Sequence, residues 1–411
     1  MASGSLPTDL LSNILLRLPL ETLITVTAVC KLWYSLIHDS TFITLHLNST
    51  NPCGNSNGNF LIMSPSCEQI CSLRCGKTLA ELSHFRIPFG GSSSCFRIVG
   101  GLNGLLCITE AFGRNFGRTI FLWNPSIRKF KTLESSCFTD DLLDSRTRVV
   151  LGFAFDQGSN DYKIVRIMYF LDGSSNYLGE TPPVAEVYSL RLDSWRTIGD
   201  DVPFLASDKF SKAIFHGAIH WLASESQEVR AEVIMSFRTG DEAFQEILMP
   251  NCDPHGFGID RCNIQLEVLK ESLSLFVCFP HCYQETNRCH VWVMSEYGLV
   301  DSWTKLYDVV PQDGMLRSLG FSKNDELLVN RMNELAFYDL DTSSYTYLSR
   351  ASCYSMDAVT YRESLVLLEA GTSILKLKYL YGRTNKELSA SRTKTKPFIS
   401  LTALMRAWKR D

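Results

Sequence analysis

The sequence predicts a mainly β protein with three parts: a small unit of three helices, a β-propeller-like domain of six or seven blades, and a basic tail. Apolar side chains recur at helical spacing over residues 1–47, short apolar strands alternate with polar turns over residues 60–380, and residues 381–411 are rich in Lys and Arg. Residues 48–59 are mostly Asn, Gly and Ser, which is typical of a linker.

The composition is that of a globular protein. Of the 411 residues, 45% are hydrophobic and 20% are charged. The net charge of -4 and the pI of about 6.1 do not favour nucleic acid or an anionic membrane as a partner. The chain has no apolar run of roughly 18 residues and no secretory signal at its start, so we expect the 14 cysteines to be reduced, in the cytoplasm or nucleus.

The first predicted helix carries Leu10, Ile14 and Leu18 at helical spacing. Pro7 suits its first turn, and Pro19 ends it. Two further short apolar patterns predict helices over residues 20–27 and 29–37.

A unit of this size cannot bury all of its large apolar side chains by itself. A partner surface is the simplest way to cover them. Burying six such side chains gains on the order of 10 kcal/mol gross, and association costs roughly 4–15 kcal/mol. Tight binding therefore requires most of the apolar face to be used together.

The pattern of these helices resembles an F-box, with one mild departure at Asn13, where the family often has an acidic residue. The resemblance implies a docking module for a Skp1-like adaptor, which in turn holds a cullin-1-type scaffold. The residues that it assigns to adaptor binding are Leu6, Pro7, Leu10, Ile14, Leu15, Leu18, Pro19, Leu23, Val29 and Trp33.

The β region contains a recurring unit in which an apolar strand with an aromatic residue is followed by a polar turn and a second strand. The anchor residues Trp123, Tyr188, Phe237, Trp292 and Phe337 are separated by 65, 49, 55 and 45 positions. Units of this length with several strands each favour propeller blades, although an irregular pair of β-sandwiches stays open as an alternative. We expect residues 60–75 to pair with residues 359–380 and close the ring.

Several segments of the β region resemble the F-box-associated domain of plant F-box proteins, in the group that includes defence-regulating and S-locus F-box proteins. The resemblance implies that this domain recruits a target protein, and it leaves the target unidentified. The segments are GLLC (104–107), LWNPSIRKFKTL (122–133), LGFAFDQGSNDYKIVRI (151–167), VYSLRLDSWRTI (187–198), FHGAIHWLA (215–223) and VWVMSEYGLVDSWTKLY (291–307).

No motif in the sequence predicts catalysis, a cofactor or a metal. The chain lacks a Gly-x-Ser-x-Gly elbow and a His-Glu-x-x-His pair, and its adjacent carboxylates fall in polar turns. Two cysteine clusters, one at Cys67, Cys71 and Cys75 and one over residues 278–290, lack the paired spacing of a zinc site. We interpret both clusters as chance and expect a non-catalytic protein.

The tail has ten Lys or Arg residues from Lys376 to the end, against two acidic residues. This pattern indicates a solvated arm, with nuclear import or an acidic partner as functional alternatives.

Two functions from different classes follow from the sequence. The first is the substrate-receptor subunit of an SCF-type ubiquitin ligase, with the helices on the adaptor and the β domain on a target. The second is a ligand- or glycan-binding sensor that carries an F-box.

Overall fold

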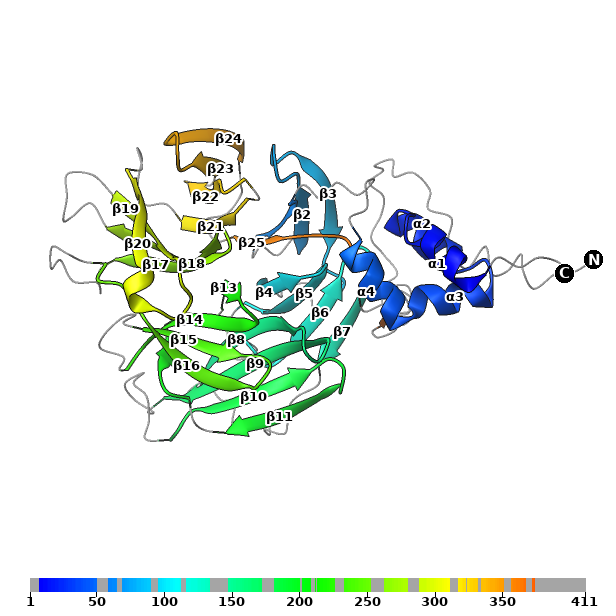
Figure 1. The fold of residues 1–411 in the computed structure, drawn as a ribbon, viewed down its shortest axis with the longest axis horizontal. Helices are drawn as coiled ribbons and strands as arrows, with labels where there is room; N and C mark the ends of the chain where they lie inside the picture. Colours follow the sequence, from blue (N-terminus) through cyan, green and yellow to red (C-terminus); the bar gives the residue numbers. More distant parts are fainter. Residues whose placement is uncertain are drawn as a thin grey trace, which may run out of the picture.

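The computed structural model shows a helical unit beside a ring of β-sheets (Figure 1). It describes residues 7–49, 58–64, 69–89, 95–111, 116–133, 147–171, 181–199, 202–207, 211, 213–225, 233–252, 262–279, 288–310, 317–322, 324–331, 334–350, 356–366 and 372–373. Leu6 and the basic tail from residue 381 lie outside these residues.

The helical unit has four helices, one more than the sequence predicts. They are α1 (Thr8–Leu15), α2 (Leu20–Val26), α3 (Lys31–His38) and α4 (Ser40–Asn48). Pro7 and Pro19 are the N-caps of α1 and α2, where proline costs no hydrogen bond. The additional helix begins at Asp39, whose carboxylate accepts hydrogen bonds from the backbone N–H groups of Thr41 at 2.9 Å and Phe42 at 3.2 Å.

Six antiparallel sheets form the blades of the propeller, and the alternative of two β-sandwiches is wrong. Blade 1 contains β25 (Asp357–Thr360), β1 (Phe60–Met63), β2 (Ile70–Arg74) and β3 (Glu81–Arg86). Blade 2 contains β4 (Phe96–Leu102), β5 (Leu105–Glu110), β6 (Ile120–Asn124) and β7 (Lys129–Leu133), with β26 (Thr372–Ser373) at its edge. Blade 3 contains β8 (Thr147–Asp156), β9 (Asp161–Phe170), β10 (Val184–Ser189) and β11 (Ser194–Gly199).

Blades 4 to 6 have the same antiparallel plan, except that the first strand of blade 4 is divided in two. Blade 4 contains β12 (Leu205–Ala206), β13 (Ala213–Phe215), β14 (Ala218–Ser224), β15 (Val233–Arg238) and β16 (Ala243–Leu248). Blade 5 contains β17 (Asn263–Leu269), β18 (Ser272–Phe279), β19 (Arg288–Met294) and β20 (Trp303–Val309). Blade 6 contains β21 (Arg317–Phe321), β22 (Leu327–Arg331), β23 (Glu334–Asp339) and β24 (Ser344–Arg350).

The five aromatic anchors of the sequence repeat all fall in the third strand of a blade, namely β6, β10, β15, β19 and β23. The repeat therefore reported the blade period correctly. Blade 1 was missed by the repeat because this blade is assembled from both ends of the β domain, with Phe60 paired to Thr360 and Met63 paired to Asp357. The ring closes between the two expected parts of the chain, although, of the described residues in the expected segment 359–380, only 359 and 360 pair with β1, and residues 372 and 373 pair with β7 of blade 2.

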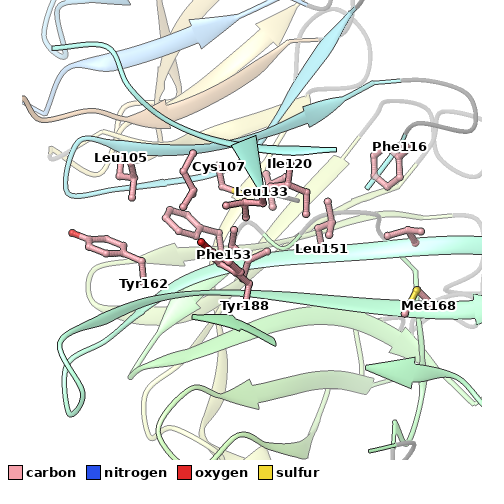
Figure 2. Packing of buried hydrophobic residues seen from close by; sticks show 14 of the residues in the cluster. Leu105, Cys107, Phe116, Ile120, Leu133, Leu151, Phe153, Tyr162, Met168 and Tyr188 are labelled. Atoms are coloured by element: carbon pink, nitrogen blue, oxygen red, sulfur yellow. The ribbon is translucent and has the colours of Figure 1, made fainter. Parts of the chain in front are cut away.

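Six hydrophobic clusters hold the blades together, one at each boundary between neighbours. At the boundary of blades 2 and 3, Figure 2 shows Leu105, Cys107 and Ile120 packed against Phe153 and Tyr188. Inner strands also contact one another around the ring: β25 with β4, β4 with β8, β8 with β14, β13 with β17, β17 with β21, and β21 with β25. Each blade thus buries both of its faces, which a lone sheet could not do.

The connections between strands fall on two faces of the ring, because neighbouring strands are antiparallel and their connections alternate between one end and the other. Short turns, such as Asn103-Gly104 between β4 and β5, lie on one face, which we call the turn face. Asn103 and Gly104 have φ angles of 53° and 77°, as a tight hairpin requires. The start of β1 pairs with the end of β25, so both lie on the turn face of blade 1. The helical unit precedes β1 in the chain and therefore joins the propeller on this turn face.

Within the described residues, the longest helix is too short and none is apolar enough to cross a membrane.

Candidate adaptor-binding face and the strap behind it

The helical unit has an inner, buried side and an outer, exposed apolar side. The inner side is a core cluster that consists of Leu11, Leu15, Leu20, Leu23, Ile37 and Phe42, together with Leu365 from the far end of the chain. Outside this core, six large apolar side chains of the unit are about half exposed: Leu10, Ile14, Val29, Leu32, Tyr34 and Leu45. We call these six residues the apolar face.

The residues that the F-box resemblance assigns to adaptor binding fall into an exposed group and a buried or half-buried group. Leu10, Ile14 and Val29 are exposed on the apolar face, and the capping residues Pro7 and Pro19 are exposed as well. Adaptor contact by these residues stays a prediction.

The remaining assigned residues belong to the interior or its border. Leu15 and Leu23 are fully buried, so they can reach a partner only if the helices separate. Leu18 and Trp33 are half-buried against the same core. These four residues support the helices that carry the exposed side chains.

Sequence reasoning left three members of the apolar face out of the site. Leu32 and Tyr34 stand on α3, where the ring of Tyr34 stacks on His38 with centroids 3.8 Å apart. Leu45 stands on α4, the helix that the sequence did not predict. Helical spacing gave no signal that links Leu32 to Val29, because Val29 lies in the turn before α3 and not on the helix.

A short segment of the chain after β25 fills the space between the helical unit and the propeller. We call residues 361–366 the strap. Leu365 is 1% exposed in the helical core, whereas Val366 belongs to the cluster between blades 2 and 3. The strap therefore belongs to both parts of the protein, and Ile127 of the turn between β6 and β7 packs against the helical core beside it.

The contact between the two parts includes a polar pair. Arg362 donates a hydrogen bond through Nη2 to the backbone carbonyl of Ser49 at 2.9 Å. Burial, together with the positive charge of Arg362, holds the pKa of His46 below its ordinary value. His46 is therefore neutral at pH 7, and its burial brings no unpaired charge into the junction.

The segments that resemble the F-box-associated domain prove to be joints between blades. In the FHGAIHWLA and VWVMSEYGLVDSWTKLY segments, His220 of blade 4 and Tyr297 of blade 5 meet with Nε2 and the hydroxyl oxygen 2.7 Å apart. His220 Nδ1 lies 3.2 Å from the carbonyl oxygen of Ala213, so Nδ1 donates there and Nε2 accepts from Tyr297. Burial lowers the pKa of His220 to about 4.

The low pKa of His220 predicts a stability loss in acid. The ordinary value is 6.5, so between pH 6.5 and 4 the unfolded chain binds one more proton at this site than the folded chain. The stabilisation is complete above pH 6.5 and is lost as the pH falls toward 4, which amounts to about 2 kcal/mol between pH 7 and pH 5.

This pH effect is measured by urea unfolding of the wild type and His220→Asn at both pH values. The asparagine amide can still donate to Ala213 but does not titrate. We expect the variant to lose about 2 kcal/mol less than the wild type on acidification. Equal losses in the two proteins would exclude His220 as a source of acid sensitivity.

A second joint contains a buried ion pair. Arg166 on β9 and Glu186 on β10 are 1% and 0% exposed and form a salt bridge. Arg166 also donates to the carbonyl oxygen of Gly117 at 2.8 Å, and its guanidinium lies 4.5 Å from the ring centroid of Trp195. Arg166 thus ties blade 3 to the connection between β5 and β6 of blade 2.

One pair of cysteines is not in the reduced state that the sequence predicts. Cys278 and Cys289 form a disulfide, so the prediction of reduced thiols is wrong for this pair. The physical reason is the strand register, which sets the two residues directly opposite on β18 and β19 with Cα atoms 4.1 Å apart. Cys67 and Cys282 lie outside the described residues.

Metal-ligating side chains do not gather in the part of the chain that the structure describes. No group of three or more His, Cys, Asp or Glu residues there is placed to hold a metal ion. Cys71 is buried between blades 1 and 2, and burial raises the pKa of its thiol.

The fold defines a class of two-part proteins, in which a small helical unit with exposed apolar side chains is fixed on the turn face of a six-bladed propeller. The family described as F-box associated beta propeller domain matches residues 93–354, and the F-box-like family matches residues 3–47. The chain belongs to the F-box-associated propeller family and carries an F-box-like domain.

The chain is similar along most of its length to F-box proteins of Arabidopsis thaliana. It is 29% identical to F-box protein At3g07870, with 74% of this chain and 72% of the relative covered. It is 26% identical to F-box/kelch-repeat protein At3g23880, with 88% and 95% covered. It is 26% identical to F-box protein CPR1, with 93% and 94% covered.

Proposed function

We propose that this protein is the substrate-receptor subunit of an SCF-type ubiquitin ligase. In this proposal the apolar face binds a Skp1-like adaptor, the adaptor connects to a cullin-1-type scaffold, and the propeller recruits a target protein. The observation that carries the proposal is the exposure of six large apolar side chains on a four-helix unit whose inner side is already covered by the strap. Such a face on a protein surface indicates a binding site.

The energetics favour a single partner that covers the whole face. Completing the burial of six half-exposed side chains gains on the order of 5–10 kcal/mol gross, which exceeds the cost of association only if the face is used as a unit. The contribution of the protein to ubiquitin transfer is proximity, because tethering a target near the charged enzyme makes their encounter intramolecular. This role requires no catalytic residue from this chain.

The proposal is tested by affinity purification of the full chain from plant cells, as wild type and as a Leu10→Asp/Val29→Asp double variant. We expect the adaptor and cullin to be recovered with the wild type only, because two carboxylates on the apolar face would be desolvated by the adaptor. Candidate targets should be recovered with both proteins and should accumulate with the variant. Equal recovery of the adaptor with both proteins would contradict the proposed site.

The compartment that this proposal requires is the cytoplasm or the nucleus, where ubiquitin ligases of this type act. Fluorescence of a tagged full chain in plant cells measures it.

A further inference from the structure

On the propeller side, the strap is hydrogen-bonded by residues of the segment 122–133, one of those that resemble the F-box-associated domain. The side-chain amide of Asn124, which is fully buried, donates to the carbonyl oxygens of Ser364 and Val366, both at 2.9 Å. The hydroxyl groups of Tyr361 and Ser126 lie 2.5 Å apart. These bonds join the strap to the propeller alone and involve no residue of the helical unit.

The close fit at Gly104 shows how little space the strap leaves. A Cβ atom at this position would lie 2.4 Å from the carbonyl oxygen of Arg362 and 2.6 Å from the hydroxyl oxygen of Ser364. Only glycine permits this approach at a φ of 77°. The strap is therefore seated in a site that the propeller builds for it.

On its other side the strap enters the helical unit. The side chain of Leu365 is surrounded by the core of the F-box-like domain, and Arg362 bonds the end of α4 at Ser49. The match to the F-box-associated family ends at residue 354, so the strap lies beyond both matched domains.

We propose that the strap is a positioning element that fixes the direction of the F-box-like domain on the propeller. A single covalent connection lets two rigid bodies rotate about each other, whereas a second contact with a buried side chain and directional hydrogen bonds selects one orientation. Leu365 and Asn124 are then positioning residues. They determine where an adaptor on the apolar face stands relative to a target on the propeller.

The first test is hydrogen exchange on the free full-length chain. In Leu365→Ser, which removes the buried side chain, and in Asn124→Ala, which releases the strap from the other side, we expect exchange protection of α1–α3 to fall by about thirtyfold. The strands of blades 3 to 5 should keep their protection. Leu365→Met and Leu82→Ser, the latter at an exposed site on β3, are the matched controls and should behave as wild type. Unchanged protection in both strap variants would overturn the proposal.

The second test separates positioning from mere stabilisation, and it rests on the proposed function because it uses a Skp1-like adaptor. We expect both strap variants to bind the adaptor within about threefold of wild type, since the apolar face is intact. X-ray scattering of the complexes should then give one compact profile for wild type and a broader, more extended one for the variants.

The outcomes of this second test are distinct. Loss of adaptor binding in both strap variants, or scattering profiles identical to wild type, would overturn the positioning role. Failure of the wild type itself to bind the adaptor would contradict the proposed function, and the hydrogen-exchange test would still decide the role of the strap.

Discussion

An aspartate in place of Ile14 is expected to remove adaptor binding while leaving the protein folded. Ile14 is 50% exposed near the end of α1, one helical turn after the exposed Leu10. A carboxylate there would be desolvated on binding without a partner, which should reduce the affinity by roughly a hundredfold or more. Titration of the purified full chain with a Skp1-like adaptor measures the effect.

The control for this prediction is Asn13→Asp, which introduces the same residue one position away on an exposed polar site. We expect it to bind as the wild type does. If Asn13→Asp and Ile14→Asp weakened binding equally, the loss would reflect added negative charge and the apolar face would not be the site.

Leu15→Asp gives the contrast on the buried side of the same helix. Leu15 is 0% exposed in the helical core, so a carboxylate there should destabilise the F-box-like domain by roughly 4 kcal/mol or more. Adaptor binding would then be lost through unfolding. Circular dichroism of the helices distinguishes this result from the loss of a contact in Ile14→Asp.

The second large effect is expected at the buried ion pair of blade 3. Arg166→Met should destabilise the propeller by about 3–5 kcal/mol, because it leaves the carboxylate of Glu186 buried without its countercharge. The variant also loses the hydrogen bond to Gly117 and the stacking on Trp195. Chemical denaturation followed by tryptophan fluorescence measures the change in the free energy of unfolding.

A double-mutant cycle separates the buried charge from the lost contacts. We expect Arg166→Met/Glu186→Gln to be more stable than Arg166→Met alone, since the second substitution removes the unpaired charge. A double variant that is no more stable than the single variant would show that packing and hydrogen bonds, not charge, account for the cost.

Much of the architecture follows from local sequence patterns. The apolar spacing of Leu10 and Ile14 predicts α1, although this helix ends at Leu15 and does not extend through Leu18 to Pro19 as expected. Pro19 instead begins α2. The five aromatic anchors lie in the third strand of five blades, because each blade repeats the same alternation of strand and turn. The family is confirmed for the same reason, since these patterns are continuous along the chain.

Other features were decided only when distant segments came together. The sequence could not separate Ile14 from its neighbour Leu15 as outer and inner residues, because the side of α1 that is buried depends on how α2, α3 and the strap pack against it. The pairing of His220 with Tyr297 and of Cys278 with Cys289 depends on the order of blades and the register of strands.

By itself, the sequence determined that a short helical unit is followed by repeated units of strand and turn, because helix and strand periodicities are properties of neighbouring residues. The tertiary structure alone decided which apolar side chains remain exposed for a partner and how the docking unit is held. Leu365 shows the reason: it lies more than three hundred residues from α1 in the sequence, yet the closure of the ring carries it into the core of the first domain.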